Sequence, residues 1–233
     1  MLRLDKMLAH MGYGTRNEIK KLMRRGAVTV DGETVKSPEL KVDPEASRVF
    51  VGAELVRYRE FIYLMMNKPA GVVSAVRDEA QETVVDLLER AYRIFHPFPV
   101  GRLDKDTEGL LFLTNDGQLG HRLLSPKKQV DKIYIAEITE PVGESDVAAF
   151  AEGIPLDDGI CLPAGLRIPG EDPRRAEVTL REGRYHQVKR MFQSRGKEVL
   201  YLKRVAMGGV PLDESLNPGE YRELTPEELR ILS

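Results

Sequence analysis

The amino-acid sequence predicts an α+β protein with two domains, a small N-terminal one and a larger one built on a mixed, largely antiparallel central sheet. The 233 residues are too many for one minimal module and fit one mid-sized domain with a small appendage. Helical and hairpin patterns fill the first sixty residues. Beyond them, strand-like segments alternate irregularly with helix-like ones and form no regular βαβ repeat, which favours this fold class. We therefore place the domains at residues 1–58 and 61–233.

Two short helices are expected at the start of the chain. The first ends at Gly12 and Gly14, and Thr15 with Glu18 then forms a capping box for the second, which ends at Gly26. One side of both helices is apolar and suited to a core. Its residues recur at helical spacing: Leu4, Met7, Leu8 and Met11, then Ile19, Leu22 and Met23.

A small hairpin sheet should follow, because the hydrophobic period changes from 3.6 to 2. Residues 27–30 and 33–35 flank the turn pair Asp31-Gly32, a pattern typical of a type I′ turn. Residues 48–51 supply a further short strand. Two helices and a small sheet therefore make up the first domain.

The second domain is expected to begin after a polar stretch at residues 57–60. The apolar run 61–66 is short enough to be its first buried strand. Further strands are predicted at residues 111–114, 132–138, 176–180 and 198–205, and helices at residues 83–92, 144–152 and 186–194.

The formal net charge of −2 hides an uneven distribution. Residues 1–25 carry seven Lys or Arg and two acidic residues, whereas residues 61–233 carry 23 basic and 28 acidic ones. A basic surface of this kind suits nucleic acid, although a charge run is also commonly the solvated face of a helix. The candidate RNA-binding residues are Arg3, Arg16, Lys20, Lys21, Arg24 and Arg25.

Several functional classes are excluded by composition. The N-terminus lacks the apolar segment of a signal peptide and no apolar run is long enough to span a bilayer, so we expect a cytoplasmic protein without membrane contact. Cys161 is the only cysteine and the four histidines lack metal-ligand spacing, which argues against a disulfide and a metal site. No phosphate-binding or dinucleotide-binding glycine motif is present, so we expect no cofactor.

The densest polar segment of the second domain is the loop between Gly101 and Gly109. It brings Arg102, Asp104 and Thr107 close together, immediately before a hydrophobic strand that can anchor them. A carboxylate on such a loop can act as a nucleophile or a general base. An ordinary structural turn is the alternative, because Asp and Gly are also common turn residues.

This segment resembles a known active-site signature. Residues 101–111, Gly-Arg-Leu-Asp-Lys-Asp-Thr-Glu-Gly-Leu-Leu, are similar to that of the pseudouridine synthases that modify ribosomal and transfer RNA. Residues 66–71, 132–134 and 183–191 resemble three further motifs of the same family, in the expected order. Residues 1–58 resemble the αL-type RNA-binding domain found in many RNA-modifying enzymes. The resemblance thus covers almost the whole chain and implies a pseudouridine-synthase catalytic domain.

The resemblance assigns roles to individual residues. It implies that Asp104 is the catalytic carboxylate, that Tyr134 stacks on the extruded uracil, and that Lys189 supplies a cation beside Asp104. The candidate substrate-binding residues are Arg102, Thr107, Tyr134, Lys189 and Arg190. A half-buried strand tyrosine and a solvated helix face are the alternatives for Tyr134 and for the two basic residues of the third motif.

Five other residues receive non-catalytic expectations. Asp106 falls at a variable position of the signature and should face solvent. Lys68 and Pro69 should be structural, because proline fixes the chain where it leaves the first strand. His186 should orient the loop of the third motif, and Cys161 should be a small apolar core residue.

The third motif also indicates a target. The segment His-Gln-Val-Lys-Arg-Met at residues 186–191 is most similar to the RsuA-type branch, which modifies small-subunit ribosomal RNA; relatives that act on large-subunit RNA tend to carry Arg at position 189. We therefore expect 16S ribosomal RNA as partner, free or in a partly assembled subunit, and a monomeric enzyme. A non-catalytic RNA-binding assembly factor and a carboxylate-dependent hydrolase are the alternatives, and the hydrolase would need a second acid-base group.

Overall fold

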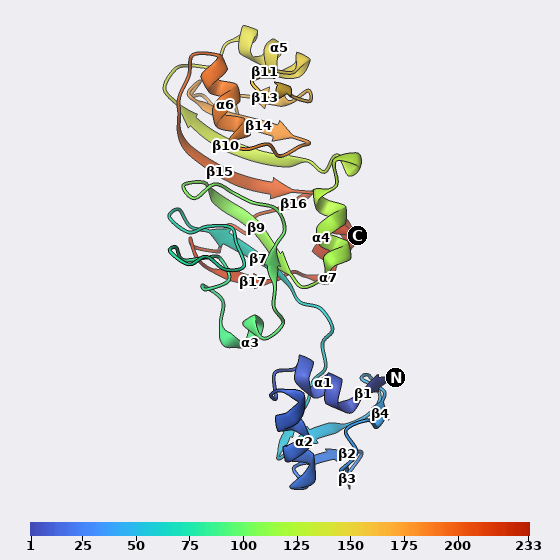
Figure 1. The fold of residues 1–233 in the computed structure, drawn as a ribbon. Helices are drawn as coiled ribbons and strands as arrows, with labels where there is room; N and C mark the ends of the chain where they lie inside the picture. The colour runs from blue at the N-terminus through green and yellow to red at the C-terminus, as the bar shows by residue number, and fades with distance from the viewer. The chain divides into compact units, whose positions relative to one another are not determined.

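The structure is a computed structural model that describes all residues from 1 to 233. Contacts within the chain divide it into two compact units. Unit 1 consists of Met1–Ile62 and Glu89–His96, and unit 2 of Tyr63–Leu88 and Pro97–Ser233. Figure 1 traces the chain through both units from the N-terminus to the C-terminus. None of the helices combines the length and the hydrophobicity that a membrane-spanning segment requires.

Unit 1 combines short helices with a four-stranded antiparallel sheet of order β3-β2-β5-β6, while β1 pairs with β4. The two predicted helices and the hairpin are confirmed, including the capping box of Thr15 and Glu18. Asp31 and Gly32 both have positive φ, as a type I′ turn requires. The elements are β1 (Leu2–Arg3), α1 (Leu4–His10), α2 (Arg16–Arg24), β2 (Val28–Val30), β3 (Glu33–Thr34), β4 (Lys41–Val42), β5 (Val49–Val51), β6 (Glu54–Leu55) and α3 (Arg90–Arg93).

One apolar cluster holds unit 1 together. The apolar sides of α1 and α2 pack on the sheet, and burial of each such side chain contributes about 1.5–3 kcal/mol. The opposite side of α2 stays exposed and basic. The buried residues are Leu4, Met7, Leu8, Ile19, Met23, Val28, Val30, Val42, Val49 and Val56.

Unit 2 is built on a nine-stranded sheet whose main order is β13-β14-β10-β15-β9-β7-β17. Only β15 and β9 pair in parallel, so the predicted mixed, largely antiparallel sheet is confirmed. In addition, β8 pairs with β9, β16 with β15, and β11 with β12. The strands are β7 (Tyr63–Lys68), β8 (Phe98–Pro99), β9 (Glu108–Thr114), β10 (Lys132–Ile138), β11 (Pro155–Leu156), β12 (Gly159–Ile160), β13 (Gly165–Arg167), β14 (Arg175–Leu180), β15 (Val199–Met207), β16 (Val210–Pro211) and β17 (Tyr221–Glu223).

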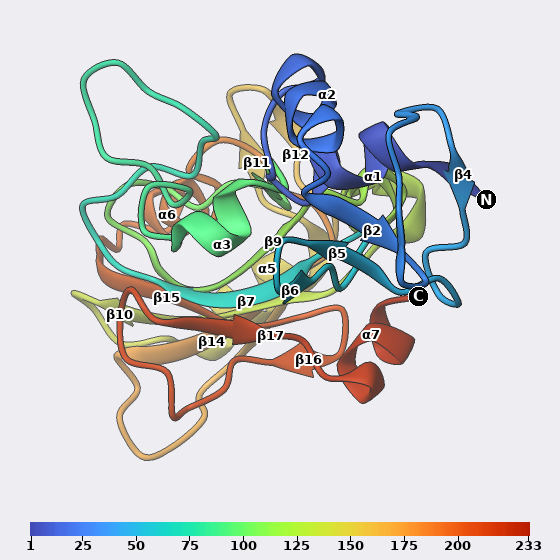
Figure 2. The ribbon, with the colours of Figure 1, turned by 90° about the horizontal axis from the view of Figure 1, so that it is seen from below.

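Helices pack on this sheet in two groups. Figure 1 shows α5 and α6 beside β11 and β13, and α4 and α7 together near the C-terminus; Figure 2 shows α7 beside β16. Leu119 and Leu123 of α4 share a buried cluster with Leu232 of α7. The helical elements are α4 (Gly117–Leu124), the 3-10 turn η1 (Pro126–Lys128), α5 (Glu144–Glu152), α6 (Gln187–Ser194) and α7 (Pro226–Leu232).

The helix predicted at residues 83–92 is wrong. Thr83 pairs with Val73 in a β-bridge, and Val73 exchanges backbone hydrogen bonds with Glu82 and Val84. The Thr83 hydroxyl and backbone also donate to the Asp86 carboxylate at 2.7 and 2.9 Å, which closes a local turn. Such side-chain bonds compete with the helix for the same backbone groups. Of the predicted range, only the stretch from Arg90 is helical, as α3.

Candidate active site

The loop of residues 101–107 connects β8 to β9 and carries Asp104 at its tip. Gly101 has a φ of 82°, a backbone conformation that glycine adopts without strain. The Thr107 backbone N–H donates to the Asp104 carbonyl at 3.1 Å, which closes a tight turn around Asp104. Leu103 is buried, whereas the Asp104 side chain is 25% exposed, so the loop is anchored at its base and open at its carboxylate.

Two buried side chains, those of Lys68 and Ser74, hold this loop through hydrogen bonds to its backbone. The Lys68 amine is buried and donates to the carbonyls of Pro69 and Thr107 at 2.9 Å and of Lys105 at 3.3 Å. Burial lowers the pKa of Lys68 to about 8. On the other side, the Ser74 hydroxyl donates to the Leu103 carbonyl at 3.0 Å and accepts from its N–H at 3.1 Å. Hydrogen bonds from these two side chains to the loop backbone thus fix the position of Asp104 before any ligand binds.

Next to the loop, a row of paired residues runs across four strands of the sheet. Lys68 pairs with Gly109, Gly109 with Arg204, and Arg204 with Tyr134. Paired residues project from the same face, so Tyr134 and Lys68 share the face on which the loop lies. Arg204 is 2% exposed and its Nε donates to the Leu110 carbonyl at 2.8 Å. A Cβ on Gly109 would stand 2.2 Å from the Arg204 carbonyl oxygen, so only glycine allows this strand pairing.

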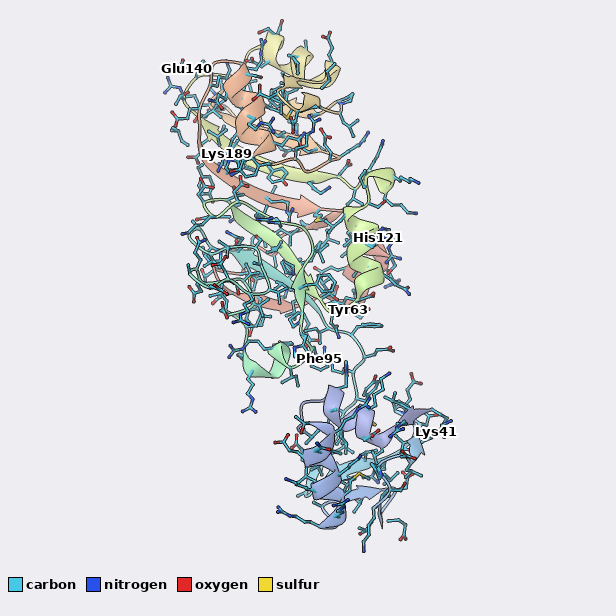
Figure 3. The ribbon with its side chains drawn as sticks, viewed as in Figure 1. Lys41, Tyr63, Phe95, His121, Glu140 and Lys189 are labelled. Atoms are coloured by element: carbon cyan, nitrogen blue, oxygen red, sulfur yellow. The ribbon has the colours of Figure 1, made fainter.

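The first turn of α6 faces the carboxylate of Asp104. Lys189 projects from this helix (Figure 3), and its Nζ lies 3.4 Å from Asp104 Oδ2 and 2.5 Å from Asp106 Oδ1. His186 Nε2 lies 3.6 Å from Asp104 Oδ1. The hydrogen bond from Lys189 holds the pKa of Asp106 below its usual range. One ammonium group therefore serves two carboxylates, and its shorter contact is to Asp106.

The loop before α6 is held by its own network. The Gln187 amide group accepts from the Arg184 N–H and donates to Glu182, and His186 takes a left-handed conformation with a φ of 46° at the helix start. Arg190 binds the carboxylate of Asp158 at 2.6 and 3.3 Å. This ion pair raises the pKa of Arg190, and it ties α6 to the turn between β11 and β12.

The sequence-predicted substrate residues lie in different environments. Arg102 is exposed on the loop, next to the buried Leu103. Thr107 is 1% exposed, and its buried hydroxyl has no hydrogen-bond partner. Tyr134 is 8% exposed and stands on the same sheet face as the loop. Lys189 is close to Asp104, while Arg190 is engaged by Asp158. The structure thus brings Lys189 to Asp104 and directs Arg190 to the β11–β12 turn.

Of the residues expected to be structural, two are buried, whereas Pro69 is half-buried and the His186 side chain is 39% exposed. Lys68 is fully buried and Cys161 is 2% exposed. Asp106 is largely exposed, as expected, but its hydrogen bond to Lys189 was not foreseen. Sequence reasoning also missed Ser74, whose contact with Leu103 spans 29 residues and leaves no local signal. No group of three His, Cys, Asp or Glu side chains could hold a metal ion.

The basic residues of unit 1 gather on α2. Arg16, Lys20, Lys21, Arg24 and Arg25 are all exposed. Arg3 differs, because its guanidinium contacts the carboxylate of Asp5 at 2.8 and 3.1 Å. Five of the six candidate RNA-binding side chains therefore share one exposed surface.

The sheet of unit 2 also carries a groove of about 590 Å³ on its other face. Ile133 and Ile135 line this groove, and they alternate with Tyr134 along β10. Arg167 and Lys203 lie at the same groove. None of the four sequence motifs contributes a catalytic candidate to it, so the groove is separate from the candidate site.

Comparisons with known proteins agree with this arrangement. Residues 62–194 match the model of the family described as RNA pseudouridylate synthase, and residues 2–47 match the S4 domain. A protein of Bacillus subtilis named uncharacterized RNA pseudouridine synthase YtzG is 52% identical and covers 100% of this chain and 98% of its own. Ribosomal small subunit pseudouridine synthase A is 39% identical in Yersinia pestis (98% of this chain, 97% of its own) and 38% in Escherichia coli (98% of both).

A solved structure supports the fold as well. A crystal structure of pseudouridylate synthase superposes with a TM-score of 0.70 at 40% sequence identity and covers 100% of both chains. The similarity therefore extends over both units and not only over the motif residues.

Proposed function

The chain belongs to the RNA pseudouridylate synthase family, and we propose that it isomerises a specific uridine of small-subunit (16S) ribosomal RNA to pseudouridine, with Asp104 as the catalytic carboxylate. The observation that carries this proposal is the position of Asp104, on an anchored loop with Lys189 Nζ 3.4 Å from its carboxylate. The small-subunit target is supported by the relatives named ribosomal small subunit pseudouridine synthase A, which match almost end to end.

The reaction breaks the N1–C1′ glycosidic bond, turns the uracil and joins C5 to C1′, while the C5 proton is lost and N1 gains one. No atom is added to the RNA and nothing is oxidised or reduced. A nucleophile that forms and then releases an adduct at C1′ or C6 of the target nucleotide is sufficient. The ionised Asp104 supplies this nucleophile, and the nearby Lys189 offsets its negative charge in a partly buried setting.

The target uridine must leave the RNA stack to reach Asp104, at a cost of a few kcal/mol. Tyr134 stands on the same sheet face as the loop and offers an aromatic ring to the extruded uracil, a contact of about 1–3 kcal/mol per base in comparable sites. Arg102, exposed beside Asp104, is placed for the phosphate or ribose of the target nucleotide. These roles of Tyr134 and Arg102 complete the proposed site.

We assign residues 1–58 to RNA binding and residues 61–233 to catalysis. The S4-domain match and the exposed basic residues of α2 support the first assignment. Phosphate contacts position RNA without reading its sequence, which suits arginine and lysine side chains on one helix face. The affinity of this domain offsets part of the cost of extruding the base.

Replacing Lys20, Lys21, Arg24 and Arg25 by glutamine should weaken RNA binding and reduce its salt dependence. Each lysine or arginine that no longer neutralises a phosphate lowers the slope of log affinity against log salt by roughly 0.7–0.9. Binding isotherms at four salt concentrations measure this slope. The matched control replaces Arg167, Arg175, Lys203 and Arg230, basic residues of unit 2 outside the candidate site. A slope that falls only in the control would assign RNA binding to unit 2.

Replacing Lys189 by methionine should lower kcat roughly a hundredfold, the scale of losing one preorganised charged group beside the reacting atoms. Lys189→Arg should retain most activity, because it keeps a cation close to Asp104. Single-turnover rates on ribosomal RNA measure both variants, with Lys203→Met as the control. Equal rates for Lys189→Met and the wild-type protein would show that the reaction does not need the Lys189 cation.

The substrate class is tested by tritium release from C5-labelled uridine. Small-subunit and large-subunit ribosomal RNA are offered separately, each naked and protein-bound. The proposal predicts release from small-subunit RNA alone. Release from large-subunit RNA alone would overturn the target while keeping the reaction, and release from neither would favour a non-catalytic RNA-binding role.

A further inference from the structure

An exposed aromatic pair stands at the start of α6. The rings of Tyr185 and His186 are stacked, with centroids 3.8 Å apart and planes inclined by 17°. Tyr185 is 75% exposed, so one face of its ring is covered by His186 and much of the rest meets solvent. His186 has a left-handed backbone conformation, with a φ of 46°. An exposed aromatic ring can stack on a nucleobase of any kind, because every base has a π-face.

The pair lies directly beside the candidate catalytic carboxylate. His186 Nε2 is 3.6 Å from Asp104 Oδ1. The Tyr185 ring stacks on the His186 ring. Tyr185 thus stacks on the same imidazole that contacts Asp104. A base that stacks on Tyr185 would neighbour the reacting nucleotide, while the reacting base itself has Tyr134 as its proposed partner.

The backbone of this pair is fixed in advance. The Arg190 guanidinium donates to the Tyr185 carbonyl at 3.1 Å and also binds Asp158. Arg184 donates to the carbonyls of Asp158 and Gly159 at 3.0 and 2.8 Å. A ring presented on a rigid backbone loses little conformational freedom on binding.

The surroundings of the pair suit an anionic, planar ligand. Arg102 and Lys105 are exposed on the loop that carries Asp104, whereas Lys189 is paired with the carboxylates of Asp104 and Asp106. A nucleotide offers a π-face to Tyr185 and a phosphate to the two exposed cations of the loop. Extrusion of the target uridine also leaves its neighbours without a stacking partner, and an aromatic side chain can replace that partner whatever the base is.

We propose that Tyr185 is a stacking platform for an unpaired nucleobase directly flanking the target uridine, with His186 supporting the ring from behind. The proposal rests on the proposed function, because it needs RNA with an extruded uridine at Asp104. It gives a binding role to a residue of the third motif to which the resemblance assigned none.

The first test observes the flanking base directly. The uridine modified by the wild-type enzyme is mapped, and an RNA fragment is made with 2-aminopurine on its 5′ or 3′ side. The background is Asp104→Asn, which prevents turnover. Binding should quench 2-aminopurine on one side, Tyr185→Ala should abolish that quenching, and Tyr185→Phe should preserve it. Unchanged quenching in Tyr185→Ala would overturn the platform.

The second test uses the active enzyme and separates the two proposals. Tyr185→Ala should raise KM about tenfold with kcat within twofold of wild type, whereas Tyr185→Phe and the surface control Ile231→Ala should match wild type. Thermal melting confirms that every variant is folded. If the wild-type enzyme isomerises uridine and Tyr185→Ala does so with the same KM, the platform alone is wrong. If the wild-type enzyme isomerises no uridine, the proposed function is wrong, and the proposed role of Tyr185 is then wrong as well.

Discussion

Asp104→Asn is expected to abolish isomerisation, with a fall in rate on the order of 10⁴-fold or more, the scale seen when a catalytic nucleophile is removed. Asparagine keeps the size of the side chain but can neither carry the negative charge nor form a releasable adduct. The backbone turn that presents residue 104 uses main-chain atoms, so it should persist. RNA affinity and thermal stability should therefore stay close to wild type.

The control for this variant makes the same chemical change elsewhere. Asp131 is a half-exposed carboxylate that binds Arg181 at 2.8 Å, outside the candidate site. Asp131→Asn should retain full single-turnover activity. Substantial activity in Asp104→Asn, with pseudouridine as the product, would show that another group performs the chemistry.

Lys68→Met is expected to cause a large loss of stability. The buried amine donates to three carbonyls, and the Pro69 and Thr107 oxygens would lose a buried donor. We expect a loss of about 3 kcal/mol in the free energy of unfolding, or a fall in Tm of roughly 6–12 °C for a chain of this size. Activity should fall as well, because the loop carrying Asp104 loses its support.

A second buried lysine provides the comparison. Lys132 is also buried, but its amine donates to a single carbonyl, that of Val130, at 3.0 Å. Burial followed by the nearby Arg204 lowers the pKa of Lys132, so its charge is costly where it stands. Lys132→Met should therefore destabilise the protein much less than Lys68→Met. Equal losses in urea unfolding would contradict the support role assigned to Lys68.

The destabilisation by Lys68→Met should also depend on pH. With a pKa of about 8 in the folded protein and the usual 10.5 when unfolded, Lys68 binds fewer protons in the folded state between those values. Stability contributed by this lysine therefore rises with pH through that window. The difference between wild type and variant should be larger at pH 9.5 than at pH 7 by roughly 2 kcal/mol. A constant difference would place the amine in a solvated environment.

The elements predicted well are those specified by local sequence. The capping box of Thr15 and Glu18, the Asp31-Gly32 turn and the alternation along β10 each act within a few residues. The helix predicted over residues 83–92 shows the limit of this reasoning. Its composition suits a helix, yet its first part pairs with Val73 and bonds to its own side chains instead.

Other elements carry local signals that the sequence-based prediction missed. Asp116 caps α4 by accepting from the N–H groups of Gln118 and Leu119, and Thr225 with Glu228 forms a second capping box before α7. The short strands β16 and β17 differ, because they exist through pairing with β15 and β7. Their two or three residues carry too little periodicity to be recognised in sequence.

The candidate site could be predicted in its residues but not in its contacts. Resemblance indicated Asp104 and Lys189, and the structure places them 3.4 Å apart although 85 positions separate them. The tighter contact of Lys189 with Asp106 and the engagement of Arg190 by Asp158 depend on how α6 and two turns meet in space. The spacing of residues in the sequence contains no information about such tertiary contacts.

The most direct test of the proposed isomerisation is the nucleoside composition of small-subunit ribosomal RNA before and after treatment with the purified enzyme. After complete nuclease digestion, chromatography should show pseudouridine gained and uridine lost in equal amounts. The RNA should keep its full length and no free uracil should appear. Released uracil or a cleaved chain would indicate a hydrolase, and an unchanged composition with RNA still bound would contradict catalysis by Asp104 altogether.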